Sequence, residues 1–460
     1  MTTEETQSPP SGDSKQPSPR RRGSRSRSRS RSRRGGSRNK AVGTPAETAA
    51  SWFGIRELFP EQEQAMEALL DGLDVMVVLP TGRGKSLIYQ VPALMFDRPV
   101  VAVSPLIALM RDQEQSLRRR DVPVVRIDST LRVTARRQAL ARVRKGGRLI
   151  LLTTPESLEK TDVREAVLAA KPRLVCVDEA HCISEWGHDF RPAYLRLGSE
   201  CRSLGIDQVL ALTATATPRV RDDIADRLGM MEDAVVITRP PVRENLGLEV
   251  ESVPGNLKIE ALARLLKKLR RPGIVYCSTT KAVDEIFGAL TRAQIPVSRY
   301  HGKMKTADRN SAQRRYMKDG RRLVMIATSA FGMGIDKPDI RYIIHYQMPG
   351  SLEQYVQEAG RAGRDGKDSR CILLYDPADA ATQQYLQRKS RPNIPQLRRV
   401  AFASAAWAEE NKAVATKDLA LSAEIPGATC ASLCAALEDL GLIGLDADRK
   451  WVAAVTPDEL

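Results

Sequence analysis

The chain has 460 residues, too many for one hydrophobic core, so its length predicts about two to four domains. Hydrophobic residues make up 42% of it, which excludes a wholly disordered chain, and no apolar run approaches the ~18 residues of a membrane span. The net charge of +16 favours a polyanionic partner, and seven scattered cysteines indicate reduced thiols inside a cell instead of a disulfide framework.

The first 48 residues are of low complexity and contain Ser-Arg repeats at Ser24–Arg33. Residues 1–40 hold twelve Lys and Arg against three acidic residues, so they carry +9 of the net charge. Because they offer few apolar side chains to bury, we expect a disordered tail. It would act as an electrostatic arm for nucleic acid, or only as a solubilising segment. Its acidic start and its lack of an apolar core argue against a transit peptide and a signal peptide.

From about residue 50 the sequence alternates between helical patterns and short apolar runs. This alternation predicts a parallel sheet with helices on both faces, in which ligands bind at the carboxyl ends of strands. Strands are expected at Val75–Leu79, Val100–Ser104, Val124–Ile127, Leu149–Thr153, Leu174–Val177 and Gln208–Ala211, and helices at Glu61–Asp71, Leu106–Arg118, Ala135–Lys145 and Arg219–Leu228.

The first of these strands leads into a candidate phosphate-binding loop. Pro80 ends the apolar run, Thr81-Gly82-Arg83-Gly84 follows, and Lys85-Ser86 begins a helical pattern. Glycines let backbone N–H groups turn toward a phosphate chain, and a helix N-terminus adds partial positive charge. Lys85 would reach the β- and γ-phosphates, and Ser86 would hold Mg²⁺. Leu79 stands where the strict motif has its first Gly, so this loop could also be an ordinary turn.

A second candidate feature follows the strand Leu174–Val177, which runs directly into Asp178-Glu179-Ala180-His181. Paired acids after a buried strand are typical of the second half of an NTPase site. Asp178 would hold the Mg²⁺ through its shell, and Glu179 would orient and deprotonate the attacking water. The hydroxyl-rich turn Thr213–Thr217 follows the next strand and could report the nucleotide state between two lobes.

After an expected linker, Arg239–Glu244, the alternation restarts and predicts a second α/β domain without a phosphate loop. Near its end, Arg361 and Arg364 stand three residues apart in a Gly-rich segment that we expect to be helical, so both would project from one side. They would contact the γ-phosphate from across a cleft, or form a solvated basic face. The elements of this domain are expected at Leu257–Leu269, Gly273–Cys277, Val283–Thr291, Val297–Tyr300, Thr306–Met317, Leu323–Ala327, Ile340–His345, Leu352–Ala359 and Cys371–Tyr375.

The last part of the chain has a winged-helix pattern, with three helices and a short strand pair. Winged helices often bind duplex DNA, but the expected recognition helix carries Glu438 and Asp439 and no Lys or Arg, so a protein-binding role stays open. The helices are expected at Gln396–Glu410, Thr416–Ala423 and Thr429–Leu440, and the strands at Gly441–Leu445 and Trp451–Val455.

Together these motifs resemble those of the RecQ family of superfamily-two DNA helicases, over residues 52 to about 376. The tetrad Asp178–His181 matches the family's acidic motif, and Ala180–Leu197 is similar to its aromatic-rich loop. Further motifs match at Ser104–Leu106, Thr154–Glu156, Tyr276–Ser278, Tyr300–Gly302, Ala330–Pro338 and Gln357–Gly366.

The resemblance implies further site residues. Gln62 would read the adenine edge, and Gln357 would belong to the nucleotide site. An aromatic group, Trp186, Phe190 and Arg191, would sense single-stranded DNA by stacking, which tolerates any sequence; core packing of the two rings is the alternative. Contacts to the DNA backbone, which position a strand without reading it, are expected from Ser104, Thr154, Ser278 and Thr328.

Three departures from the family pattern bear on function. Leu58–Gln62 reads Leu-Phe-Pro-Glu-Gln where the family usually has Phe-Arg-Pro-Gly-Gln, so Phe59 replaces an arginine. Arg83 stands where the phosphate loop usually has Gly, and we expect its side chain to point out of the loop, in the direction of the second lobe. The family's zinc subdomain is missing, because only three cysteines and no His follow His345, so we expect no zinc.

We therefore expect an α/β fold of two tandem RecA-like parallel-sheet domains, with ATP and Mg²⁺ between them, followed by a small winged-helix-like α+β domain. The expected divisions are a disordered Arg/Ser-rich tail at 1–48, an ATP-binding lobe at 49–239, a second lobe at 240–376, a linker at 377–395 and the winged-helix-like domain at 396–460.

The expected function is ATP-driven 3′-to-5′ movement on single-stranded DNA, with unwinding of partially duplex DNA in repair and recombination. A nucleotide-switched DNA clamp that does not unwind and an RNA helicase are the alternatives. Single-strand-binding or repair proteins are expected partners through the C-terminal domain or the tail. The expected location is the cytoplasm of a bacterium, at the nucleoid, or the nucleus of a eukaryote, with no membrane association.

Overall fold

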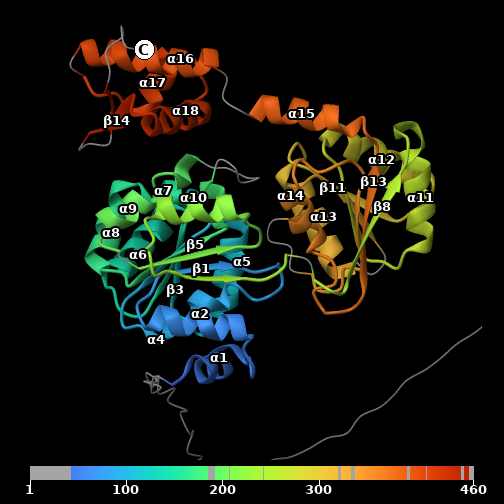
Figure 1. The fold of residues 1–460 in the computed structure, drawn as a ribbon, viewed down its shortest axis with the longest axis horizontal. Helices are drawn as coiled ribbons and strands as arrows, with labels where there is room; N and C mark the ends of the chain where they lie inside the picture. Colours follow the sequence, from blue (N-terminus) through green and yellow to red (C-terminus); the bar gives the residue numbers. More distant parts are fainter. Residues whose placement is uncertain are drawn as a thin grey trace, which may run out of the picture. The chain divides into compact units, whose positions relative to one another are not determined.

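Two parallel β-sheets, each covered by helices, form the body of the protein (Figure 1). The computed structural model describes residues 43–184, 192–206, 208–241, 243–319, 323–332, 337–390, 394–410, 412–446 and 450–454. The strand–helix alternation of the sequence is confirmed in both sheets, because every pairing within them is parallel.

The first sheet has seven strands in the order β3-β4-β2-β5-β6-β1-β7. In this order β6 lies between β1 and β5. Because the strands are parallel, the loops that follow these three strands lie next to one another at the carboxyl edge of the sheet. The strands are β1 (Val75–Val78), β2 (Val100–Val103), β3 (Val124–Ile127), β4 (Ile150–Thr153), β5 (Leu174–Asp178), β6 (Val209–Thr213) and β7 (Val235–Thr238).

Helices lie on both faces of this sheet, with α2 and α4 on one side and α8 and α9 on the other (Figure 1). The helices of this lobe are α1 (Pro45–Phe53), α2 (Pro60–Leu70), α3 (Leu87–Gln90), α4 (Pro92–Met95), α5 (Ile107–Arg118), α6 (Val133–Arg144), α7 (Pro155–Leu158), α8 (Thr161–Ala170), η1 (Ala180–Ile183), η2 (Pro192–Tyr194), α9 (Leu197–Ser203) and α10 (Pro218–Leu228).

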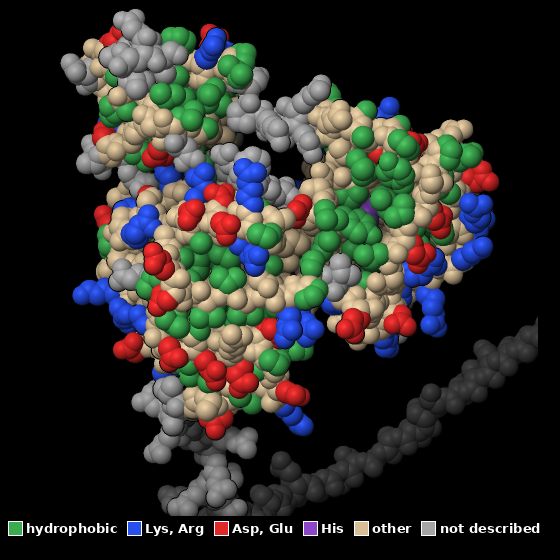
Figure 2. Space-filling view, viewed as in Figure 1, with side chains coloured by type: hydrophobic (Ala, Val, Ile, Leu, Met, Phe, Trp, Pro, Cys, Tyr) green, Lys and Arg blue, Asp and Glu red, His purple; other side chains and the backbone are tan. Residues whose placement is uncertain are grey.

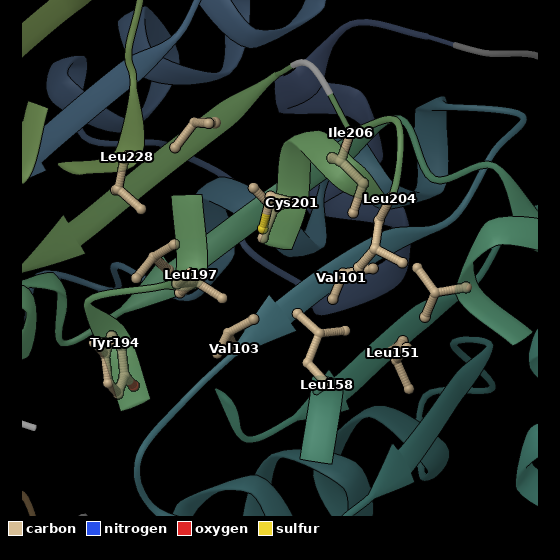
Figure 3. Packing of buried hydrophobic residues seen from close by; sticks show 14 of the residues in the cluster. Val101, Val103, Leu151, Leu158, Tyr194, Leu197, Cys201, Leu204, Ile206 and Leu228 are labelled. Atoms are coloured by element: carbon tan, nitrogen blue, oxygen red, sulfur yellow. The ribbon is translucent and has the colours of Figure 1, made fainter. Parts of the chain in front are cut away.

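Each central strand is apolar along its whole length because its side chains alternate between two separate cores. Val100 and Ala102 of β2 face the core beneath α1 to α5, whereas Val101 and Val103 face the core beneath α6 and α8 to α10. Figure 3 shows the second core, where Leu197 and its neighbours on α9 pack over the strand side chains. These two cores hold the phosphate loop and the acidic motif on one rigid sheet.

The second sheet has six strands in the order β10-β11-β9-β12-β13-β8. Its strands are β8 (Leu246–Ser252), β9 (Gly273–Tyr276), β10 (Val297–Tyr300), β11 (Val324–Ala327), β12 (Tyr342–His345) and β13 (Ser369–Tyr375). Its helices are η3 (Gly255–Leu257), α11 (Lys258–Lys268), α12 (Thr280–Arg292), α13 (Thr306–Asp319) and α14 (Leu352–Ala359).

The expected linker at 377–395 is largely a helix, α15 (Asp379–Ser390), attached to the second lobe. Asp379 accepts a 2.7 Å hydrogen bond from Nζ of Lys258, which is 1% exposed and also donates to the carbonyl of Tyr346 at 3.0 Å. One turn further on, the Gln383 amide donates to Ser278 Oγ at 2.7 Å. The sequence suggested a linker because these anchors are polar and leave no apolar stripe to recognise.

The last unit contains three helices and a hairpin, as the winged-helix pattern predicted. They are α16 (Ile394–Glu409), α17 (Thr416–Ser422), α18 (Gly427–Asp439), β14 (Ile443–Leu445) and β15 (Trp451–Ala453), and the two strands pair antiparallel. Trp451 is buried in its core and donates from its indole to Thr416 Oγ1 at 2.9 Å.

The N-terminal boundary differs from the expected one. The expected tail ended at residue 48, but α1 already begins at Pro45 and is capped by Thr44, whose backbone N–H bonds Glu47 at 2.8 Å. Residues 1–42 lie outside the described ranges. No helix within those ranges is both long and apolar enough to cross a bilayer.

The surface of the first lobe is not uniformly basic. Figure 2 shows acidic side chains gathered over the side where α1 and α2 lie, and α2 itself contributes Glu63 and Glu67, which are exposed. A phosphate backbone would be repelled there. Any nucleic acid bound by this lobe is therefore expected on another face.

Candidate nucleotide site

The phosphate loop closes on itself at the end of β1. Gly82 and Gly84 have φ values of +89° and +66°, a left-handed backbone that favours glycine. Lys85 Nζ donates a 2.8 Å hydrogen bond to the carbonyl of Leu79. Leu79 is 1% exposed because it continues the strand into the core, which explains why a leucine stands where the strict motif has glycine.

The acidic motif follows β5, two strands away from the loop in the sheet. Asp178 is the last residue of β5. Glu179 follows with φ +52° and ψ +47°, a left-handed backbone conformation that is unusual for residues other than glycine. His181 Nδ1 lies 2.9 Å from Thr213 Oγ1 and 3.5 Å from Glu179 Oε2. The motif is thus joined to Thr213, where the hydroxyl-rich turn after β6 begins, and a response of this turn to the nucleotide stays a prediction.

Lys85, Asp178 and Glu179 form one charged cluster. Burial, and then repulsion from Glu179, raise the pKa of Asp178 to about 7, against the opposing effect of Lys85. Burial likewise lowers the pKa of Lys85, although Glu179 and Asp178 oppose this. Two carboxylates face one ammonium group, so a further cation would stabilise the ionised form of Asp178.

The donor set of the cluster fits Mg²⁺, which takes oxygen ligands, keeps several waters and needs only one or two protein groups beside phosphates. Asp178 offers a carboxylate, and Ser86, whose hydroxyl accepts a 3.2 Å hydrogen bond from Gln113, offers a second oxygen. Within the described ranges no three His, Cys, Asp or Glu side chains group into a metal site. The expected absence of zinc stays a prediction, because other segments lie outside those ranges.

Gln62 is bonded to the phosphate loop. Its Nε2 donates to the carbonyls of Arg83 and Gly84, each at 3.0 Å, and its Oε1 accepts from the backbone N–H of Phe59 at 3.0 Å. Gln62 is 3% exposed. The Arg83 guanidinium leaves the loop, as expected, but it lies over the Phe59 ring of its own lobe and not in the expected direction of the second lobe.

The two predicted arginines stand on a turn and not on a helix, which corrects the expectation. Helix α14 ends at Ala359, and Gly363 has φ +55°. Arg361 is buried and donates to the carbonyl of Gly332 within its own lobe. Arg364 is half-buried and borders the phosphate loop. Its Cγ lies 3.5 Å from the position that a Cβ would take on Gly82. Only Arg364 of the pair is therefore placed beside the phosphate loop, and Gln357 is half-buried in the last turn of α14.

Arg243 holds this turn and was missed in the sequence. It donates to the carbonyls of Gly360 and Gly363 at 3.0 Å and to that of Ala362. Burial, and then the positive charge of Arg364, lower its pKa. Its Nη1 lies 3.6 Å from the position that a Cβ would take on Gly82, so the Arg243 guanidinium lies beside the phosphate loop, as Arg364 does. No sequence signal marks it, because backbone carbonyls leave no pattern in the sequence.

A side chain of the phosphate loop also bonds the arginine turn. Thr81 Oγ1 donates to the carbonyl of Gly360 at 2.7 Å, so this carbonyl accepts from Thr81 and from Arg243. Thr81 was predicted as a cofactor contact, and here its hydroxyl faces the turn.

The expected DNA-contacting residues fall into three groups. Trp186, Phe190 and Arg191 lie outside the described residues. Two hydroxyls are buried: Ser104 lies beside Asp178 and helps to hold its pKa down, and Thr154 caps α7, where its Oγ1 accepts from Ser157 N at 3.3 Å. Ser278 and Thr328 are half-buried at strand ends of the second lobe.

The expected recognition helix, α18, carries Glu438, whose Oε2 lies 3.3 Å from Nη1 of Arg196. Arg196 follows η2 in the first lobe, and its guanidinium lies 5.4 Å from the centroid of the Trp451 ring. An acidic residue on α18 thus pairs with a basic residue of this same chain, and the choice between DNA and a protein as the partner of this unit stays a prediction.

The described architecture is that of the DEAD/DEAH box helicases. The family model of that description matches residues 59–224, and the helicase conserved C-terminal domain matches residues 257–366. In fold, the chain is similar to the Mycobacterium smegmatis helicase Lhr bound to ssDNA and AMP-PNP, with a TM-score of 0.61 and 22% identity over 89% of this chain and 61% of that one. It is also similar to Saccharomyces cerevisiae Dbp5 bound to RNA and ADP BeF3, with a TM-score of 0.57 and 17% identity over 76% and 91%.

Sequence relatives define the family more narrowly. The chain is 39% identical to the ATP-dependent DNA helicase RecQ of Bacillus subtilis over 360 residues, which cover 76% of this chain and 60% of the relative. It is 40% identical to the probable ATP-dependent DNA helicase RecS of the same organism over 343 residues, covering 74% and 68%. The chain belongs to the RecQ family of ATP-dependent DNA helicases, and it matches about two thirds of the length of these relatives.

Proposed function

We propose that this protein hydrolyses ATP to move 3′-to-5′ along single-stranded DNA and to unwind partially duplex or branched DNA in repair and recombination. The observation that carries the proposal is the buried cluster of Lys85, Asp178 and Glu179 beside a loop whose two glycines need left-handed backbone. Family membership points the same way, since the relatives named above are called DNA helicases.

Each side chain of the cluster has a separate role in this proposal. Lys85 would leave the Leu79 carbonyl and bind the β- and γ-phosphates, while Ser86 and Asp178 would hold Mg²⁺, which neutralises phosphate charge when it is bound. Glu179 would take the proton of the attacking water. Arg364 would contact the γ-phosphate, with Arg361 and Arg243 positioning its turn.

DNA would stimulate this site through the segment between η1 and η2. That segment holds Trp186, Phe190 and Arg191, and it is flanked by His181 on one side and by Tyr194 on the other, whose hydroxyl lies 3.4 Å from the Asp178 carbonyl. Stacking of bases on aromatic side chains would therefore act within a few residues of the acidic motif. Such a motor would work where chromosomal DNA is, in a bacterial cytoplasm or a eukaryotic nucleus.

The test is ATPase activity without nucleic acid, with single-stranded DNA and with RNA of the same sequence, followed by unwinding of a duplex with a 3′ or a 5′ tail. We expect DNA to stimulate turnover more than RNA, and the 3′-tailed duplex to be unwound. Stimulation by RNA above DNA would replace the proposal with an RNA helicase. DNA-stimulated hydrolysis without unwinding of either duplex would replace it with a nucleotide-switched clamp.

A further inference from the structure

Four exposed basic residues form a row along one edge of the first sheet. The strands β3, β4, β2 and β5 are neighbours in that order and are parallel, so the loops that precede them lie next to one another at the amino edge. The candidate nucleotide site lies at the opposite, carboxyl edge. Each of these four loops carries an exposed basic side chain that makes no ion pair with any residue the structure describes. In strand order, this basic row is Arg119, Lys145, Arg98 and Lys171.

Backbone contacts fix the spacing of these loops. The backbone N–H of Arg173 donates to the carbonyl of Pro99 at 2.8 Å, which joins the loops before β5 and β2. The backbone N–H of Ile150 donates to the carbonyl of Pro123 at 2.9 Å, which joins the loops before β4 and β3. Adjacent strands lie about 4.8 Å apart, so a row across four of them is about 14 Å long.

Two further arginines add positive charge behind the basic row. Nε of Arg148 donates to the carbonyl of Phe96 at 3.4 Å, and the guanidinium carbon of Arg173 lies 5.9 Å from the centroid of the Phe96 ring. Both are half-buried, and neither is ion-paired with a residue in the described ranges. Their charge is therefore not cancelled locally and acts together with that of the row.

The charge on this edge is separated by sign. The loops at 96–99, 119–123, 145–149 and 171–173 hold seven Lys and Arg against two Asp, which leaves +5, whereas residues 41–460 carry only +7 in total. The loops before β1 and β7 hold the exposed acids Asp71, Glu232 and Asp233 and no basic residue. A surface that only keeps a protein soluble mixes both signs, so this separation favours a polyanionic partner for the basic half.

The chemistry of the basic half fits the backbone of duplex DNA. Its loops contain a single aromatic residue, Phe96, which is half-buried beneath Arg173. Sites for single strands combine positive charge with exposed aromatic rings on which bases stack, whereas contacts to a duplex backbone need only donors and positive charge. Phosphates of one strand of a duplex follow one another every 3.4 Å of helix axis, so a row of about 14 Å faces about four of them.

The strand in the motor does not reach this row. The expected contacts to that strand, Ser104 and Thr154, directly follow β2 and β4 at the carboxyl edge. Strands of four to five residues are about 13–17 Å long, so the two edges are separated by that distance. We propose that the basic row binds the backbone of a duplex arm of branched DNA while the motor strand lies at the opposite edge. This inference rests on the proposed function and names the second DNA segment that the protein holds.

The test measures binding of a blunt 20-base-pair duplex and of single-stranded DNA to the full chain, without nucleotide, over a range of salt concentrations. In the variant with all four residues of the row changed to Gln, we expect the duplex to bind at least about tenfold more weakly. The slope of log Kd against log salt should fall by about 3 to 4, one for each lost phosphate contact. Affinity for single-stranded DNA and turnover stimulated by it should stay within about twofold. Arg98→Lys with Arg119→Lys should bind the duplex like the wild type, because a backbone contact needs the charge alone.

The matched control changes three exposed basic residues on separate helices, Arg264, Lys281 and Lys417, to Gln, which removes similar charge without touching the row. Its duplex affinity should stay within about twofold of the wild type. Arg119, Lys145 and Lys171 also stand at the C-terminal ends of α5, α6 and α8, where a cation is favourable. A lowered Tm with unchanged duplex affinity would therefore overturn the inference and leave the row a role at helix ends only.

Two further results would also overturn the inference. Equal losses for single-stranded and duplex DNA would place the row on the path of the motor strand. Loss of polyglutamate binding with unchanged duplex binding would make it a surface for an acidic protein. A wild-type chain that binds the duplex through the row but hydrolyses no ATP with single-stranded DNA would instead refute the proposed function.

Discussion

Arg243 donates a 3.0 Å hydrogen bond to the carbonyl oxygen of Gly360, the residue directly after the end of α14. The same guanidinium bonds the carbonyls of Ala362 and Gly363, and Asn245 Nδ2 bonds those of Gly363 at 2.9 Å and Lys367 at 2.8 Å. Two side chains just before β8 therefore hold the turn that presents Arg364.

Replacement of Arg243 by alanine should slow DNA-stimulated ATP turnover about tenfold or more while the KM for ATP rises at most about threefold. Without Arg243 the turn no longer holds Arg364 in a fixed position. The transition state depends on that position more than the bound ground state does, so turnover falls more than KM rises. Arg243→Lys should recover little, because one ammonium group cannot serve three carbonyls.

Arg370→Ala is the control for this change, because Arg370 lies on β13 of the second lobe and its guanidinium pairs with Glu249 of β8 instead of with the carbonyls of the turn. Its turnover should match that of the wild type. If Arg243→Ala behaves like Arg370→Ala, the turn does not need Arg243 for its position.

Glu179→Gln should lower turnover by about 10²–10⁴-fold and leave ATP affinity nearly unchanged. The amide keeps the size of the side chain but cannot accept the proton of the attacking water. Single-turnover hydrolysis and nucleotide binding measure the two effects separately. Glu67→Gln, at an exposed acid on α2, is the control. Persistent turnover in Glu179→Gln would remove Glu179 as the base.

Two helical glycines should respond to alanine in opposite directions. A Cβ on Gly198 of α9 would lie 2.1 Å from the carbonyl oxygen of Arg227 on α10, so Gly198→Ala should destabilise the first lobe by about 1–3 kcal/mol. A Cβ on Gly288 of α12 would meet only the flexible end of Arg292 at 3.5 Å, so Gly288→Ala should stabilise by about 0.5–1 kcal/mol. Thermal unfolding measures both; an unchanged Tm for Gly198→Ala would mean that α9 and α10 move apart at no cost.

Removal of residues 1–42 should flatten the salt dependence of DNA affinity. The first 40 residues hold twelve Lys and Arg, and each phosphate they neutralise releases counterions on binding. The cut is made after residue 42 and not 48, because Thr44 caps α1 and Ala49 is buried. The measurement is the slope of log Kd against log salt concentration, and equal slopes for the two proteins would show that the segment does not bind DNA.

The sequence predicted the central strands closely, because strands buried on both faces are continuous apolar runs. It missed β7 and β8, which lie at the edges of their sheets. In β8, Leu248 and Val250 are 47% and 67% exposed and alternate with glutamates, so the strand reads as polar. β7 and β8 bury too few side chains to leave the apolar pattern of a core strand.

At the site, the sequence predicted the residues whose chemistry belongs to a motif, such as Lys85 and Asp178, but not the groups that hold them. Arg243 and the partners of Gln62 bond backbone carbonyls, and these are identical in every residue type. The helical expectation for Arg361 and Arg364 failed for a related reason, since the turn depends on a glycine in the left-handed region and on a distant arginine.

The seven cysteines of the chain all lie in the described ranges, and all are buried free thiols. Burial raises the pKa of Cys201 and of Cys371 to about 12, so these sulfurs are protonated and inert while the protein is folded. The pKa of Cys430 is instead lowered by its hydrogen bond with Cys434, but its sulfur is buried like the other six. Because all seven thiols are buried, fluorophores that react with thiols should attach first where a new cysteine is introduced at the surface. A dye at Glu67→Cys on α2 and another at Lys281→Cys on α12 would report lobe movements during the nucleotide cycle by energy transfer, without removal of any natural cysteine.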